Sequence, residues 1–161
     1  MGATLTNLRT GQQVQAVSDP NTAVSNPLQV MVGDTVRLSW TVTNIGSSTG
    51  NFRIVWTTGV GDLVSNTFTL SAGQNASGTL DVKYNNVMNA FPSSIRVENI
   101  TLNKIDHILY AGIQVQEAPK GRIDHPELPF GLPPELVVIG GIALVGVGAF
   151  VLADILRKQR I

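Results

Sequence analysis

The side chains in this sequence best suited to bind a metal ion or to carry a proton are its two histidines, His107 and His125. Each follows an aspartate in the tripeptide Ile-Asp-His. A metal site needs further ligands at set spacings, and neither histidine has a second histidine or a suitably spaced acidic residue nearby. We therefore expect two surface histidines and no metal centre.

Other catalytic motifs are missing from the sequence. It has no Gly-x-Ser-x-Gly nucleophile motif, no phosphate-binding loop and no dinucleotide fingerprint. It has no cysteine, which excludes a thiolate nucleophile, a disulfide and a cysteine-bound zinc. The members of a Ser-His-Asp triad need not be neighbours, so a triad stays open, although no motif favours one. We expect a protein that is not an enzyme and holds no cofactor.

Three modification patterns are too short to carry weight. The chain has two glycosylation sequons, Asn75-Ala76-Ser77 and Asn99-Ile100-Thr101, and its start fits the N-myristoylation pattern at Gly2. Two sequons are close to chance in a chain rich in Asn, Ser and Thr. Whether they are used depends on the compartment.

Charge is scarce and balanced. The 161 residues include 11 basic and 11 acidic side chains, and the charged fraction of 14% is well below the usual quarter. The mean hydropathy is +0.17. A protein that recognises nucleic acid is normally distinctly basic, so we expect no specific nucleic-acid recognition.

An uncharged stretch near the C-terminus lowers the charged fraction and raises the mean hydropathy. Residues 136–153 comprise 14 apolar residues and four glycines. As a helix they would be about 27 Å long, close to the thickness of the hydrocarbon core of a bilayer. A domain this small could hardly surround a helix that is apolar on every side. We therefore predict a transmembrane α-helix over residues 135–156, with a lipid bilayer as partner.

Small residues within this span could let a second helix approach. Ala149 and Ala153 are four positions apart, and Gly141 and Gly148 lie seven apart on nearly the same face. Such spacing favours helix packing and a homo-oligomer formed through the membrane. Glycine is also frequent in membrane spans for no specific reason.

A proline-rich spacer precedes the span. Residues 118–134 hold five of the eight prolines, namely Pro119, Pro126, Pro129, Pro133 and Pro134. Proline removes backbone donors and fixes φ, so regular structure should end near Glu117. We expect a head of residues 1–117 on a semi-extended spacer.

The head has the alternation of β-strands. Apolar and polar residues alternate over residues 35–43, residues 46–50 form a turn, and the alternation resumes at residues 52–56, which predicts a hairpin. Shorter strands are expected at residues 12–17, 28–32, 64–70, 79–84, 94–103 and 107–116. The sequence predicts an all-β fold, a single antiparallel immunoglobulin-like β-sandwich of about seven or eight strands, followed by the membrane helix.

Three segments of the head carry a further resemblance. They are Val32-Gly33-Asp34-Thr35-Val36, Trp40-Thr41-Val42-Thr43-Asn44-Ile45-Gly46 and Phe68-Thr69-Leu70-Ser71-Ala72-Gly73-Gln74. Together they resemble the CARDB-type immunoglobulin-like module, named for bacterial cell adhesion. The resemblance covers residues 26–115 and implies a sandwich that serves as a non-enzymatic spacer or binding unit.

The positive charges after the predicted span indicate which side of the membrane each end of the chain occupies. Residues 157–161 contain Arg157, Lys158 and Arg160, against Lys120 and Arg122 on the head side of the span. This small excess favours a cytoplasmic tail. With a cytoplasmic tail, the head would lie outside the cell. No signal sequence begins the chain, however. The alternative is therefore a tail-anchored protein with a cytoplasmic head.

Three functions fit this organisation. We favour a structural or assembly protein that docks onto other protein subunits, in particular a minor capsid protein that links a viral capsid to an underlying membrane. There, the basic tail would face packaged nucleic acid without reading its sequence. The alternatives are a cell-surface adhesion module in a cell envelope and an accessory subunit of a membrane enzyme complex.

Overall fold

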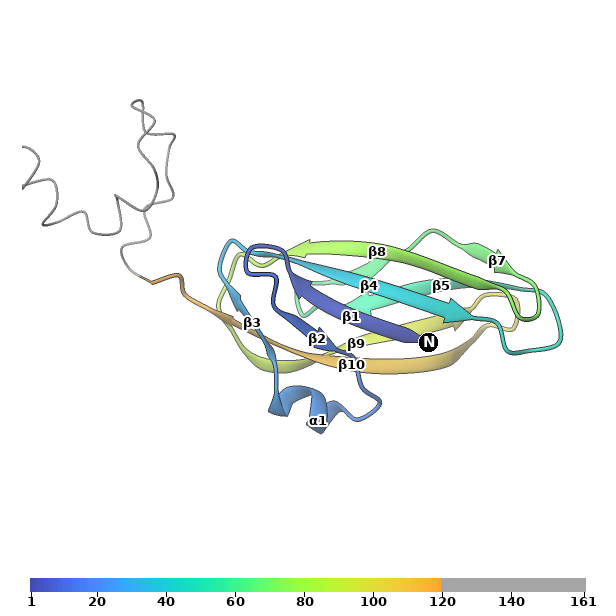
Figure 1. Ribbon diagram of the computed structural model, residues 1–161, viewed down its shortest axis with the longest axis horizontal. Helices are drawn as coiled ribbons and strands as arrows, with labels where there is room; N and C mark the ends of the chain where they lie inside the picture. The colour runs from blue at the N-terminus through green and yellow to red at the C-terminus, as the bar shows by residue number, and fades with distance from the viewer. Residues whose placement is uncertain (120–161) are drawn as a thin grey trace, which may run out of the picture. The chain divides into compact units, whose positions relative to one another are not determined.

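Two β-sheets face each other across a shared apolar core in the computed structural model (Figure 1). The structure describes residues 1–119. Its elements in chain order are β1 (Gly2–Asn7), β2 (Gln13–Gln15), α1 (Pro20–Ser25), β3 (Leu28–Met31), β4 (Thr35–Thr43), β5 (Gly50–Thr57), β6 (Asp62–Val64), β7 (Phe68–Leu70), β8 (Asn75–Lys83), β9 (Met88–Asn99) and β10 (Lys104–Gln116). The predicted all-β fold is confirmed for these residues, with ten strands instead of seven or eight.

The strands divide into sheet A, in the order β2-β1-β4-β8, and sheet B, in the order β3-β10-β9-β5-β6. Strand β7 pairs with the first residues of β5. All pairs are antiparallel except β3 with β10, where Leu28 lies opposite Ile113. The prediction of a purely antiparallel sandwich is therefore wrong at this pair. A parallel pair needs a crossover connection, and the long route from β3 through both sheets to β10 provides it.

The core contains the apolar residues that alternate with polar ones along the strands, as predicted. On β4, four apolar side chains are buried, namely Val36, Leu38, Trp40 and Val42. On β5, Phe52, Ile54 and Trp56 are buried against them from sheet B. Period-two alternation therefore identified the core-facing residues of β4 and β5.

The predicted hairpin between residues 35–43 and 52–56 is wrong. Strand β4 pairs with β1 and β8 in sheet A, whereas β5 pairs with β6, β7 and β9 in sheet B. The turn at residues 46–50 therefore carries the chain from one sheet to the other. Alternation shows which face of a strand is buried, and it does not show which strand is the neighbour.

Several strand boundaries also differ from the prediction. The strand expected over residues 64–70 is two separate strands, β6 and β7, because Ser65 interrupts the ladder and exchanges hydrogen bonds with the backbone of Ile54. Strand β9 begins at Met88, within the expected break at residues 85–92, and ends at Asn99 instead of 103. Pro92 is thus accommodated inside a strand.

The helix α1 was not predicted, because six residues are too few to show a helical period. Its first turn is capped by Asp19, whose carboxylate accepts hydrogen bonds from the backbone N–H of Thr22 at 2.7 Å and from its hydroxyl at 2.6 Å. It packs on the outer face of sheet B over Gly112 (Figure 1). A Cβ atom at Gly112 would lie 2.1 Å from the carbonyl oxygen of Ala23.

Most of the predicted membrane anchor lies outside the described residues. This holds for the spacer beyond residue 119, the helix at 135–156 with Gly141, Gly148, Ala149 and Ala153, and the tail with Arg157, Lys158 and Arg160. Among residues 1–119, no helix has the length and apolarity needed to cross a bilayer.

Candidate functional site

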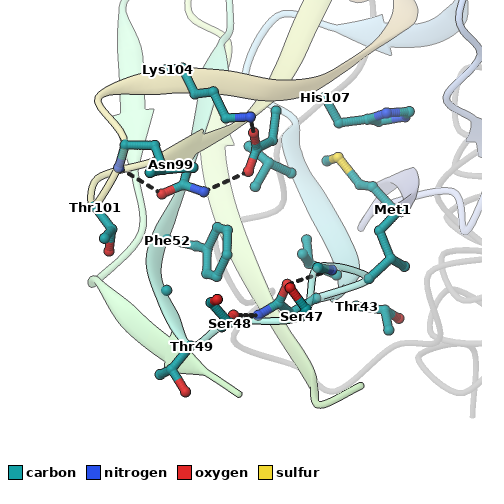
Figure 2. A pocket seen from close by; sticks show the side chains of 18 residues that line it. Met1, Thr43, Ser47, Ser48, Thr49, Phe52, Asn99, Thr101, Lys104 and His107 are labelled. Atoms are coloured by element: carbon teal, nitrogen blue, oxygen red, sulfur yellow. Dashed lines mark hydrogen bonds and ion pairs between the residues drawn. The ribbon is translucent and has the colours of Figure 1, made fainter. Parts of the chain in front are cut away.

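One end of the two sheets opens into a hollow of about 770 Å³ (Figure 2). Residues 44–49, after β4, line it together with Thr101 and Leu102 of the turn at residues 100–103 between β9 and β10. Residues 71–74, before β8, are joined to Asn44 by backbone hydrogen bonds. We call the end of the sheets formed by residues 44–49, 71–74 and 100–103 the loop end. Figure 2 shows the ring of Phe52 deep in the hollow, with the backbone and side chains of the loops around it.

Asn44 holds two of these loops in place. Its buried side-chain amide donates hydrogen bonds to the carbonyl oxygens of Ser48 and Leu70, each at 2.9 Å, and its Oδ1 accepts one from the N–H of Gly46 at 3.0 Å. Its backbone carbonyl also accepts from the N–H of Gly73 at 2.7 Å. A buried amide with several partners in one segment fixes the conformation of the residues around it.

Asn99 has the same role in the third loop. Its Oδ1 accepts a hydrogen bond from the N–H of Leu102 at 3.0 Å, and its Nδ2 donates to Asp106 at 2.8 Å. Lys104 forms an ion pair with the same carboxylate at 2.9 Å. Partial burial would raise the pKa of Asp106, but the bonds from Lys104 and Asn99 outweigh it and lower that pKa.

Aliphatic side chains project from these fixed loops. Ile45 is 96% exposed and Leu102 is 61% exposed, and both line the hollow. Ile100 and Ile105, on either side of the same turn, are also exposed. Single exposed aliphatic residues are ordinary, whereas several at one end of a domain are typical of a binding surface.

The two loops at residues 45–49 and 100–103 contain no charged side chain. The charged side chains that line the hollow are Lys104 and Asp106, which pair with each other. The loop end therefore offers apolar side chains, hydroxyl groups and backbone groups, and a partner needs no charge to match it. This composition favours a protein surface over a charged ligand.

The chain leaves the sheets at the opposite end. Strand β10 begins with Lys104 at the hollow and ends at Gln116, which lies beside Met31 of β3. Its 13 residues span about 40 Å at the usual rise per residue. Figure 1 shows β10 running along the sheet from the loop end to this exit.

One of the two histidines singled out in the sequence lies at this hollow. His107 is exposed, as predicted, and lines the edge of the hollow with Met1 (Figure 2). Among the described residues, no three His, Asp or Glu side chains lie close enough to share a metal ion. His125 lies outside the described residues.

A second group of charges lies on the outer face of sheet B. Arg96 bonds to Glu98 at 3.0 Å and to Asp62 at 3.2 Å, and Arg53 bonds to Glu98 at 2.7 Å. The bonds from Arg96 and Arg53 lower the pKa of Glu98. Because each of these charges has an opposite partner across the strands, we interpret the group as a stabilising network.

Sequence reasoning did not identify the loop end. The residues that it singled out, in the membrane helix and the tail, lie outside the described residues. Asn44 was considered only within a segment that resembles the CARDB-type module, and Asn99 only as part of a sequon. An asparagine at the end of an alternating strand was the available signal, since such residues hold turns through their side chains.

No family model matches the chain, and no curated protein matches its sequence. The resemblance to the CARDB-type module therefore stays a prediction.

Proposed function

We propose that this chain is a non-enzymatic structural or assembly protein whose β-sheet head is tethered to a membrane by a C-terminal helix over residues 135–156. In this proposal the head docks through its loop end onto a larger protein assembly. The version that we favour is a minor capsid protein that joins a viral capsid to the membrane beneath it.

The observation that carries the proposal is the separation of the two ends of the head. The chain exits after Gln116, and the exposed Ile45 and Leu102 lie about 40 Å away at the other end of β10. A head tethered at one end is best placed to contact a partner with the opposite end.

Preformed loops also support docking. Asn44 and Asn99 hold the loops by hydrogen bonds within the head, so little conformational entropy would be lost when a partner binds. Apolar side chains held on rigid loops are the usual anchors of a protein interface.

The experiment compares two variants of the full-length chain in its native membranes. Ile45→Ser combined with Leu102→Ser should release the head from its partner subunits, measured by co-sedimentation after extraction with mild detergent. Val87→Ser is the matched control, because Val87 is 54% exposed and precedes β9 at the exit end. It should leave co-sedimentation unchanged.

Two results would contradict the proposal. If the unmodified chain is recovered alone, without stoichiometric companions, no assembly partner exists. If the loop-end variant co-sediments as well as the control, the partner binds elsewhere on the head. Protease protection of the head in intact particles or cells then tests the capsid version, which requires the head to be enclosed.

A further inference from the structure

Strand β8 forms an outer edge of sheet A. It pairs with β4 over nine consecutive residues, from Asn75 opposite Thr43 to Lys83 opposite Thr35, without a bulge. Within residues 1–119, no strand pairs with its other side. Its free backbone N–H and C=O groups therefore extend along about 30 Å of sheet edge.

The other sheet edges in the described part of the chain are much shorter. Strands β2 and β6 have three residues each and β3 has four, against nine in β8. Short strands, prolines, bulges and unpaired charges are the usual protection of an edge against another chain. Strand β8 has no proline or bulge, and its two charges, Asp81 and Lys83, stand together near one end.

One of these charges already has a partner of opposite charge within the head. Arg37 of β4 donates two hydrogen bonds to the Asp81 carboxylate, each at 2.8 Å. The bonds from Arg37 lower the pKa of Asp81 and keep it charged and engaged within the head. The middle of β8 therefore presents an uncharged edge.

The inner side of β8 is only partly covered. Ala76 and Leu80 face the core but stay half-buried, because no further strand lies beyond them in the described residues. A strand added to this edge would complete the burial of both side chains. Both the backbone groups and the apolar side chains of β8 would then gain partners.

The sequence of β8 is complementary to itself when two copies run antiparallel around Thr79. This is the register that pairs all nine residues. The opposed pairs are then Asn75 with Lys83, Ala76 with Val82, Ser77 with Asp81, Gly78 with Leu80, and Thr79 with Thr79. On the core side, a small residue faces a larger one at every position, and no like charges are opposed.

We propose that β8 binds the β8 of a second copy of this chain, antiparallel and centred on Thr79. The pairing joins the two four-stranded A sheets into one continuous sheet across a two-fold axis. The occupant is a second copy rather than an unrelated strand because the register matches β8 to itself in size and charge.

The chain has no cysteine, so any thiol cross-link must come from the one cysteine that is introduced. Thr79→Cys in the full-length chain, purified in mild detergent, should form a covalent dimer with a short thiol–thiol cross-linker. Thr41→Cys is a matched control on the same exposed face of β4, one strand from the edge. Ser47→Cys, on an exposed loop, reports random collision.

We expect Thr79→Cys to cross-link about tenfold faster than either control, because pairing raises the effective concentration of the two thiols. A mixture of Ser77→Cys and Asp81→Cys chains should cross-link faster than either alone, which checks the register. Equal rates at positions 79, 41 and 47 would overturn the proposal. That result is also expected if β8 binds a strand of another protein, since the purified chain would then lack its partner.

A charge variant gives an independent measurement. Thr79→Lys places two like charges opposite each other at the two-fold axis. It should therefore halve the protein mass of the particle, measured by sedimentation in detergent. Thr41→Lys should not change this mass. If Thr79→Lys leaves the mass unchanged and Thr79→Cys shows no preferred cross-linking, the chains are not joined through β8.

Discussion

The indole ring of Trp40 lies over Gly78, its partner across β4 and β8, and fills the space that a side chain at position 78 would need. A Cβ atom at Gly78 would lie 2.5 Å from Cζ2 of Trp40. Phe68 stacks on the same indole from sheet B, with ring centroids 5.2 Å apart. The glycine therefore lets a large aromatic ring close the core near the edge of sheet A.

The pair predicts strongly coupled mutations. Trp40→Ala should lower the free energy of unfolding by about 3–5 kcal/mol, because it removes a buried aromatic side chain. Gly78→Ala should lower it by about 1–3 kcal/mol, because the indole must move. In the Trp40→Ala background the space is vacant, so Gly78→Ala should then have almost no effect.

Denaturant melts of the four chains in the cycle measure this coupling. If the two effects simply add, the ring does not occupy the space over Gly78. If Trp40→Ala alone loses less than about 1 kcal/mol, Trp40 is not a core residue.

The sequence predicted this part of the fold well, because burial imposes a period of two on a strand. The predicted bounds of β4, residues 35–43, agree with the structure, and so does its buried face. What alternation could not predict was pairing. The residues after Asn44 cross between the sheets, and only contacts with strands distant in sequence distinguish that path from a hairpin.

Other features were missed because their signals are short. Helix α1 has six residues, and its position depends on Gly112, which is 89 residues away from Ala23 in the chain. Strand β1 shows only Ala3 and Leu5 as buried apolar positions. The loop end could not be predicted either. Asn44 and Asn99 are distant in sequence, and only the folded structure shows which loops their side chains hold by hydrogen bonds.

The head should fold without its predicted anchor. Within residues 1–119, residues from both sheets form one apolar core. A fragment ending at Pro134 should therefore unfold in one cooperative transition with a midpoint close to that of the full chain in detergent. Aggregation of the fragment, or a broad non-cooperative melt, would show that the head depends on residues beyond 134.

Acid should destabilise the head through Asp34. Burial alone would raise the pKa of this carboxyl, but hydrogen bonds from Arg9, Asn7 and the N–H of Met31 lower it to about 2, from an ordinary value of 3.8. A lowered pKa stabilises the fold above about pH 4, and the effect is lost as the pH falls toward 2. The loss should be on the order of 2 kcal/mol.

The control for this prediction is Asp81, whose pKa is also lowered but whose side chain is 41% exposed. Asp34→Asn should flatten the dependence of stability on pH between about 4 and 2, and should already destabilise the fold at neutral pH. Asp81→Asn should change little, because exposed ion pairs contribute little. Parallel acid curves for the unmodified chain and Asp34→Asn would refute the assignment.

The loop end should lose its rigidity when Asn44 is replaced. Asn44→Ala leaves the carbonyl oxygens of Ser48 and Leu70 without their amide partner, which should lower the free energy of unfolding by about 2–3 kcal/mol. Amide hydrogen exchange should rise at residues 45–49 and 71–74 and stay unchanged in β9. Ser47→Ala, an exposed change in the same loop, should have no effect on either measurement.

The basic tail should matter for topology or assembly and not for folding. Replacing Arg157, Lys158 and Arg160 by Gln removes three charges that follow the predicted span, and none of them belongs to the described core. The melting midpoint of the head should therefore stay the same, whereas its protease protection in membranes or its co-sedimentation with partner subunits should change. A variant with unchanged stability, sidedness and assembly would show that the tail is passive. A lowered melting midpoint would show instead that the tail contacts the head.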